Sequence, residues 1–164
     1  MLKSLNLLKI YLVCLVIFVL AVVTAYVLTN PGTNNDLLNL KIKVSFTHIF
    51  FNNLKVVLLL IFLGPLTFGL GSIGILIING IILGGTLGNI KNDLNLISLL
   101  LPHGVIEVPI LIFATSVGIK LTFDLLSMKI KVKDLSKNLS LILLGLLIAA
   151  SIETFITPMF LKGV

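Results

Sequence analysis

LLLPHGVIEVPILIFATSVGI, residues 99–119, is long enough to cross a bilayer as a helix, at about 1.5 Å per residue across a hydrocarbon core of about 30 Å. Its two ionisable residues, His103 and Glu107, are four positions apart, so on a helix they lie on one face within hydrogen-bonding reach. Charged groups at membrane depth are costly and normally face the interior of a helix bundle. The stretch therefore predicts a transmembrane helix that carries a polar centre.

Apolar residues dominate the rest of the chain as well. Of its 164 residues, 58% are hydrophobic and 11% are charged, which lies outside the range of soluble globular domains. We therefore predict an all-α, polytopic transmembrane helix bundle that forms a single domain over residues 1–164. The net charge of +6 comes from lysines between the apolar runs, where membrane topology requires them, so no nucleic-acid partner is expected. The expected partners are membrane lipid and other proteins, and no cofactor is expected.

Five apolar runs are predicted to span the membrane. They cover residues 10–28, 47–63, 72–88, 99–119 and 139–157. Lys3 and Lys9 precede the first run, which we interpret as an uncleaved anchor. Gly64 and Pro65 are expected to end the second span and to start a tight hairpin into the third. Residues 30–46 begin with turn residues and continue as a mixed segment that fits either a short strand or an interfacial segment.

The placement of lysines predicts the orientation of the chain. Residues 120–138 carry five of the twelve lysines and form the most basic connection, which we interpret as a cytoplasmic loop. Lys3 and Lys9 fall on the same side of the membrane in a five-span topology. We therefore expect a multi-pass protein of the plasma or inner membrane with a cytoplasmic N-terminus.

Glycines mark positions where helices are expected to pack closely. Gly80, Gly84 and Gly88 recur every four residues in the third span and form one groove that another helix backbone can approach. Gly118 is interpreted as a packing position on the face of the fourth span that carries His103 and Glu107.

Five polar residues are expected to form a common centre in the outer half of the bundle. The predicted topology places His103 and Glu107 in the outer half of the fourth span and Glu153 in the outer half of the fifth. Asn53 begins the second span from the same side. Asn79, directly before the glycine groove, is a mid-membrane amide that needs a partner, and such amides more often join helices than bind ligands.

Three kinds of site fit this polar centre. A clasp between helices would fix their register, whereas a relay of two carboxylates and a histidine would carry protons in a permease or channel subunit. A metal site would use His103, Glu107 and Glu153 as ligands, although no metal is favoured. His48 and His103 are the only histidines, neither lies in an H-E-x-x-H frame, and no nucleophile accompanies them. No catalytic residue and no enzyme activity are therefore predicted.

Several short motifs together carry a family resemblance. They are FFNNL at 50–54, Gly64, Asn79-Gly80 with Gly84, PHGVIEVP at 102–109, Gly118, and Glu153 ahead of Pro158. From about residue 46 to its end the chain resembles the stage II sporulation protein M family of small integral membrane proteins. In spore-forming bacteria such proteins are associated with engulfment and hold peptidoglycan-degrading partners at the membrane. The resemblance implies the helical membrane fold and a role as a scaffold that binds partner proteins or its own copies, with a permease or channel subunit as the alternative.

Overall fold

The structure is a computed structural model that describes residues 6–31, 45–92 and 94–157; for residues 94–96 and 98–103 it describes the backbone alone. The helices are α1 (Leu7–Leu28), α2 (Phe46–Leu66), α3 (Leu70–Asn89), α4 (Leu94–Leu126) and α5 (Val132–Ser151), and α5 continues into a π-helical turn, η2 (Ile152–Ile156). The described residues contain no strand. All five α-helices include a segment long and apolar enough to cross a membrane, which confirms the predicted five-span helical fold. Most of the segment 30–46 lies outside the described residues.

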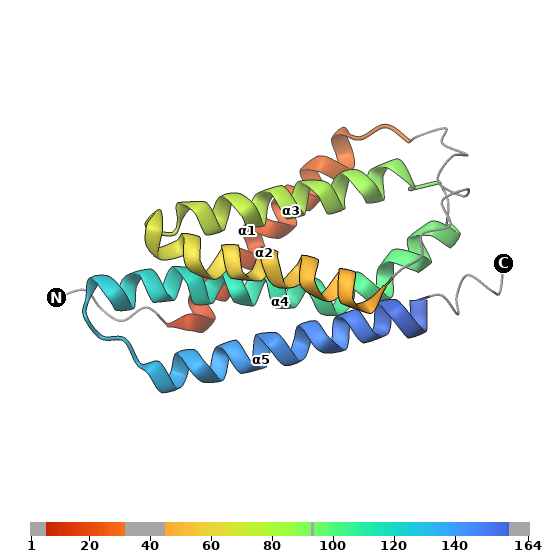
Figure 1. The fold of residues 1–164 in the computed structure, drawn as a ribbon. Coiled ribbons are helices and arrows are strands. Elements are labelled where there is room, and N and C mark those ends of the chain that lie inside the picture. The colour runs from red at the N-terminus through yellow and green to blue at the C-terminus, as the bar shows by residue number, and fades with distance from the viewer. Residues whose placement is uncertain (1–5, 32–44, 93, 158–164) are drawn as a thin grey trace.

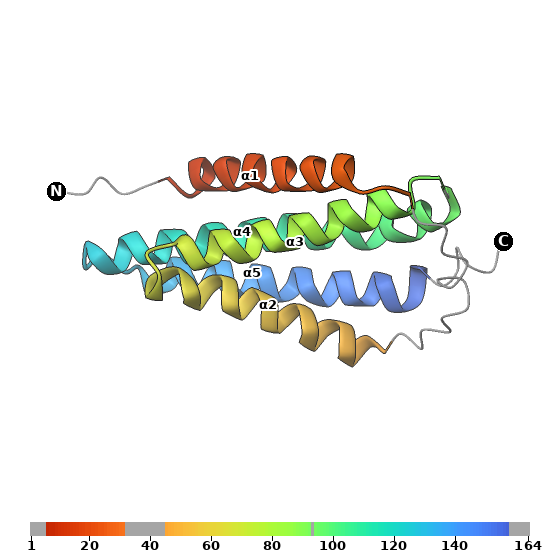
Figure 2. The same cartoon turned by 90° about the horizontal axis from the view of Figure 1, so that it is seen from above.

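The helices form one bundle with two distinct ends (Figures 1 and 2). One end holds the start of α1, the α2–α3 turn and the α4–α5 turn, and the other holds the end of α1 and the starts of α2 and α4. Six of the eight described lysines lie toward the first end, which we call the basic end: Lys9, Lys120, Lys129, Lys131, Lys133 and Lys137. Lys55 and Lys91 lie toward the opposite end. The bundle is therefore electrostatically asymmetric along its axis.

The glycine groove of α3 is filled by α1. A Cβ atom added to Gly84 would collide with the Val22 carbonyl oxygen, and one added to Gly88 would lie 2.9 Å from the Tyr26 carbonyl oxygen. Gly80 faces Phe18 in the same way, so the two helices run parallel with a constant offset in sequence. Only residues without a side chain allow two helix backbones to approach so closely.

A second close approach joins α2 to α4. A Cβ atom on Gly64 would lie 2.5 Å from the Gly118 carbonyl oxygen, and one on Gly118 would collide with the Leu60 carbonyl oxygen. The Ser72 hydroxyl donates to the Leu60 carbonyl oxygen at 2.5 Å and connects α3 to the same region of α2. Cys14 of α1 is buried beside this core at 1% exposure. These close approaches bring together a core of buried apolar side chains that includes Leu60, Ile61 and Ile112.

The α2–α3 turn follows from its glycines and proline. Pro65 lies in the last turn of α2, which ends at Leu66, somewhat later than the predicted limit of 63. Gly69 adopts a positive φ of 90°, which residues with a Cβ atom rarely adopt, and its N–H donates to the Gly64 carbonyl oxygen at 2.7 Å. This bond caps α2 and turns the chain directly into α3.

The prediction of a basic loop over 120–138 is wrong in extent. Helix α4 continues to Leu126 and α5 begins at Val132, so the connection covers only residues 127–131. Lys120 donates to Asp124 at 2.5 Å, an i,i+4 ion pair that supports the last turns of α4. Lysine interrupts an apolar run in sequence, but its long side chain can extend toward water from a continuing helix.

Candidate functional site

Glu107 lies at a cavity between α3 and α4, and its side chain is 8% exposed. The cavity has a volume of about 180 Å³. Asn79 and Thr86 of α3 share it with Glu107, and Phe18 of α1 closes one side. The remaining wall is apolar or backbone: Ile82, Leu83, Gly104, Val108 and Leu111. A carboxyl, an amide and a hydroxyl therefore meet within an otherwise apolar region.

The polar side chains of α3 are partly satisfied by their own helix. Asn79 Nδ2 donates to the Ile75 carbonyl oxygen at 2.8 Å, and the Thr86 hydroxyl donates to the Ile82 carbonyl oxygen at 2.8 Å. The bond to Ile75 uses one of the two amide hydrogens of Asn79. Such bonds lower the cost of placing these groups at membrane depth.

A larger pocket of about 410 Å³ shares Leu83, Gly104 and Val108 with this cavity. We call the two together the α3–α4 cleft. A Cβ atom added to Gly104 would meet nothing within 4 Å, and Val105 beside it is 67% exposed. The cleft therefore leads from Glu107 sideways to the exposed face of the bundle at Val105.

Pro109 adds a backbone feature to this cleft, because it lies inside α4 and lines the larger pocket. Proline has no N–H, so it cannot donate the usual helical bond to the carbonyl oxygen of Val105, four residues earlier. The wall of the cleft therefore contains the carboxyl group of Glu107 and, nearby on α4, a carbonyl oxygen of Val105 that receives no helical bond from Pro109.

The predicted polar centre is only partly assembled at this cleft. Glu107 and Asn79 line it together, whereas Asn53 is buried on α2 at 8% exposure and does not line it. Glu153 lies in η2, half-buried, where η2 packs against α4. His103 occupies the turn of α4 before Glu107, and its side chain is outside the described atoms. Among the described side chains, no group of three potential ligands lies close enough to hold a metal ion.

Between Glu107 and the basic end, α4 is tightly packed. Six consecutive or nearly consecutive residues are at most 5% exposed: Leu111, Ile112, Ala114, Thr115, Ser116 and Val117. The hydroxyls of Thr115 and Ser116 donate to carbonyl oxygens of α4 itself, at 2.9 and 2.7 Å. Gly118 then lies directly against the backbone of α2. This closed layer of α4 lies between Glu107 and the basic end of the bundle.

Sequence reasoning missed three contributors to the cleft: Phe18, Thr86 and Gly104. Thr86 follows Asn79 by seven residues and lies on the same face of a helix, which is a signal that the sequence contains. Gly104 is recognisable only as part of the PHGVIEVP motif. The contribution of Phe18 depends on which helix fills the glycine groove, and no local pattern specifies that.

Two comparisons with known proteins find similar sequences. Residues 13–158 match the family described as stage II sporulation protein M. An uncharacterized protein of Methanocaldococcus jannaschii is 37% identical, over 71% of this chain and 73% of the relative. No solved structure matches the chain.

Proposed function

The chain belongs to the stage II sporulation protein M family, and from this membership and the geometry of the α3–α4 cleft we propose that it is a membrane scaffold that binds partner proteins or its own copies. The cleft opens to the side of the bundle, where a transmembrane segment of a partner can reach Glu107 and Asn79. Polar groups in an apolar surrounding give helix association its specificity. The cleft would then act as the recognition site.

The observation that carries this proposal is the closed layer of α4. A permease or channel subunit, the alternative function, needs a polar path from one end of the bundle to the other. The described part of α4 instead places buried apolar residues, internally bonded hydroxyls and a backbone contact between Glu107 and the basic end. This arrangement favours a recognition site that is open on one side. It does not favour a translocation path.

The asymmetry of charge supports a definite orientation. Six described lysines lie toward the basic end and two toward the other. Because cytoplasmic segments of membrane proteins are enriched in lysine and arginine, the basic end would face the cytoplasm and α1 would begin there. The α3–α4 cleft would then lie nearer the outer surface of the cell membrane.

The protein would act without catalysing a reaction. Of the described side chains that line the cleft, Glu107 is the one ionisable group, and the Thr86 hydroxyl is bonded within its own helix. This set lacks the neighbouring nucleophile and base that covalent catalysis requires. The polar groups are therefore better suited to holding a partner than to transforming a substrate.

Site-specific photocrosslinking tests the scaffold. A photoreactive residue replaces Val105, which is 67% exposed at the cleft, or Leu144, which is 55% exposed on α5, as a control. In the membranes of the cells that make the protein, we expect a discrete protein adduct from position 105 and none from position 144. Adding Gly104→Phe should abolish the adduct, because the ring fills open space at the cleft.

Transport provides the opposing measurement. We expect purified protein in liposomes to conduct protons and ions no faster than empty liposomes do. The scaffold should also tolerate Glu107→Gln, which keeps a polar group of the same shape, whereas a proton relay would not. A flux that is present in wild type and lost in Glu107→Gln would refute the proposal, as would equal adducts from positions 105 and 144.

A further inference from the structure

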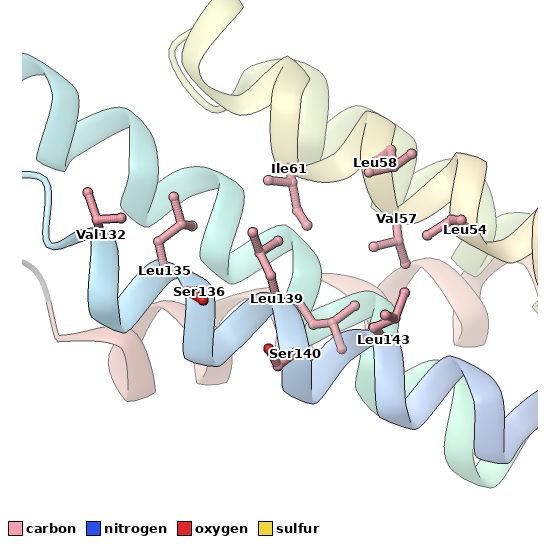
Figure 3. A pocket seen from close by; sticks show the side chains of 11 residues that line it. Leu54, Val57, Leu58, Ile61, Val132, Leu135, Ser136, Leu139, Ser140 and Leu143 are labelled. Atoms are coloured by element: carbon pink, nitrogen blue, oxygen red, sulfur yellow. The ribbon is translucent and has the colours of Figure 1, made fainter.

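A second opening lies between α2 and α5 and shares no lining residue with the α3–α4 cleft. This α2–α5 groove has a volume of about 420 Å³ and runs from Ile61 to Leu54 along α2 and from Val132 to Leu143 along α5 (Figure 3). In the view of Figure 1 the two helices diverge toward the basic end, where α5 begins. Its walls are mostly leucine, valine and isoleucine.

The length of the groove corresponds to one leaflet of a bilayer. Val132 and Leu143 are eleven residues apart, which is about 16 Å along a helix and about half of a hydrocarbon core of about 30 Å. An acyl chain of a lipid in that leaflet therefore matches the groove in length and in polarity.

A polar stripe follows the edge of this groove on α5. Lys133, Ser136, Lys137 and Ser140 occupy positions i, i+3, i+4 and i+7 and therefore lie along one side of the helix. All four are exposed, and both serines line the groove. Within the described part of the chain, neither lysine is in an ion pair, and neither serine hydroxyl is in a hydrogen bond. From the basic end inward, the stripe thus offers a lysine, a serine, a second lysine and a second serine.

We propose that the α2–α5 groove binds an anionic phospholipid of the leaflet at the basic end. One acyl chain lies along the apolar walls, and the phosphate of the headgroup contacts Lys133 and Lys137. The serine hydroxyls face the polar linkage between headgroup and chain. The occupant must be apolar over one leaflet and negative at the basic end, and an anionic lipid meets both conditions.

Photoreactive lipids test this site directly. The full-length protein is placed in vesicles that contain either phosphatidylglycerol or phosphatidylcholine with a photoreactive group on the acyl chain. Adducts on residues 54–61 and 132–143 are quantified against adducts on the exposed side of α3, at Leu70, Ile78 and Ile81. We expect the groove to be labelled several times more by phosphatidylglycerol than by phosphatidylcholine after this normalisation.

Variants that remove one lysine distinguish a specific lipid-binding site from general attraction of anionic lipids to the positively charged end of the protein. A lysine near an anionic surface favours association by about fivefold, so Lys133→Gln should lower the preference for phosphatidylglycerol by about that factor. Lys9→Gln removes the same charge at the same end, but on α1, and should leave the preference unchanged. Ser140→Phe should reduce labelling by both lipids because its ring enters the groove, and circular dichroism verifies that the variant is folded.

Three results would overturn the assignment. Equal labelling by the two lipids would show that the lysines do not select the headgroup. An equal effect of Lys9→Gln and Lys133→Gln would attribute the preference to overall charge. A crosslink between groove residues of two copies, together with loss of lipid adducts, would show that a second copy covers the groove.

Discussion

Gly84→Ala is expected to separate α1 from α3 and to destabilise the bundle. The added methyl group would collide with the Val22 carbonyl oxygen and lie 2.9 Å from the carbonyl carbon and the Cα atom of Val22. All three atoms belong to the backbone of α1, so no side-chain rotation can relieve the contact. The helices must move apart by about 1 Å to reach an ordinary contact distance of about 3.5–4.0 Å.

The size of the effect follows from two opposing contributions. Alanine is favoured over glycine within a helix by about 1 kcal/mol, whereas overpacking of a tight contact costs about 1–3 kcal/mol. Gly74→Ala provides the matched control, because a Cβ atom there meets nothing within 4 Å and only the favourable contribution remains. We expect the two variants to differ in unfolding free energy by about 1–3 kcal/mol, with Gly84→Ala the less stable.

Thermal melting in detergent, followed by helical circular dichroism at one fixed scan rate, measures this difference. For a chain of this size, 1 kcal/mol corresponds to about 2–4 °C in Tm, so Gly84→Ala should melt roughly 2–12 °C below Gly74→Ala. Gly85→Ala, whose Cβ atom would lie 3.7 Å from Thr29 Oγ1, should behave like Gly74→Ala. If Gly84→Ala melts at or above both controls, the close approach of α1 to α3 is wrong.

Three further substitutions can be measured in the same melts. Ser72→Ala removes the buried hydrogen bond to the Leu60 carbonyl oxygen and should cost about 0.6–2 kcal/mol; an unchanged Tm would show that this bond contributes nothing. Gly69→Ala forces alanine to a φ of 90° and should cost about 1–2 kcal/mol, so a higher Tm would contradict this turn geometry. Lys91→Gln removes the ammonium that lies 5.8 Å from the Tyr26 ring centroid and should cost about 0.5–1 kcal/mol. High salt should reduce this effect, so a Tm difference that does not depend on salt would argue against the interaction of Lys91 with the ring.

The glycine groove illustrates how far sequence reasoning reaches. A repeat of Gly80, Gly84 and Gly88 predicts that some helix backbone approaches α3, because small residues every four positions leave one continuous depression. The pattern does not identify the helix, since any backbone can enter it. That α1 fills the groove, in parallel orientation, depends on the complete topology.

The limits of the apolar runs were harder to predict than their number. Helix α4 extends from Leu94 to Leu126, beyond the expected span of 99–119 at both ends. A hydropathy pattern detects the part that lies in lipid, whereas the helix continues for as long as its backbone bonds and ion pairs such as Lys120–Asp124 persist. A lysine such as Lys120 therefore does not by itself mark the end of a helix.

The sequence predicts which polar residues stand out in the apolar runs, but it does not predict which of them line the cleft together. A carboxyl at Glu107 and an amide at Asn79 stand out in apolar runs, so the sequence predicts both as polar sites. Their shared cavity depends on how α3 and α4 separate around Gly104, and that separation is a property of packing. Asn53 resembles them in sequence and is buried on another helix that does not line the cleft.

The parallel pairing of α1 and α3 also determines when the bundle can form during synthesis. Helix α1 is made first, but the surface that receives it is complete only after Gly88 has been added to the chain. Helix α2 is made in the interval and, within the described residues, packs extensively on α3, α4 and α5 but not on α1. The nascent α1 must therefore remain in the membrane without its final neighbour until the third helix is inserted, and the insertion of α3 is the step that begins assembly.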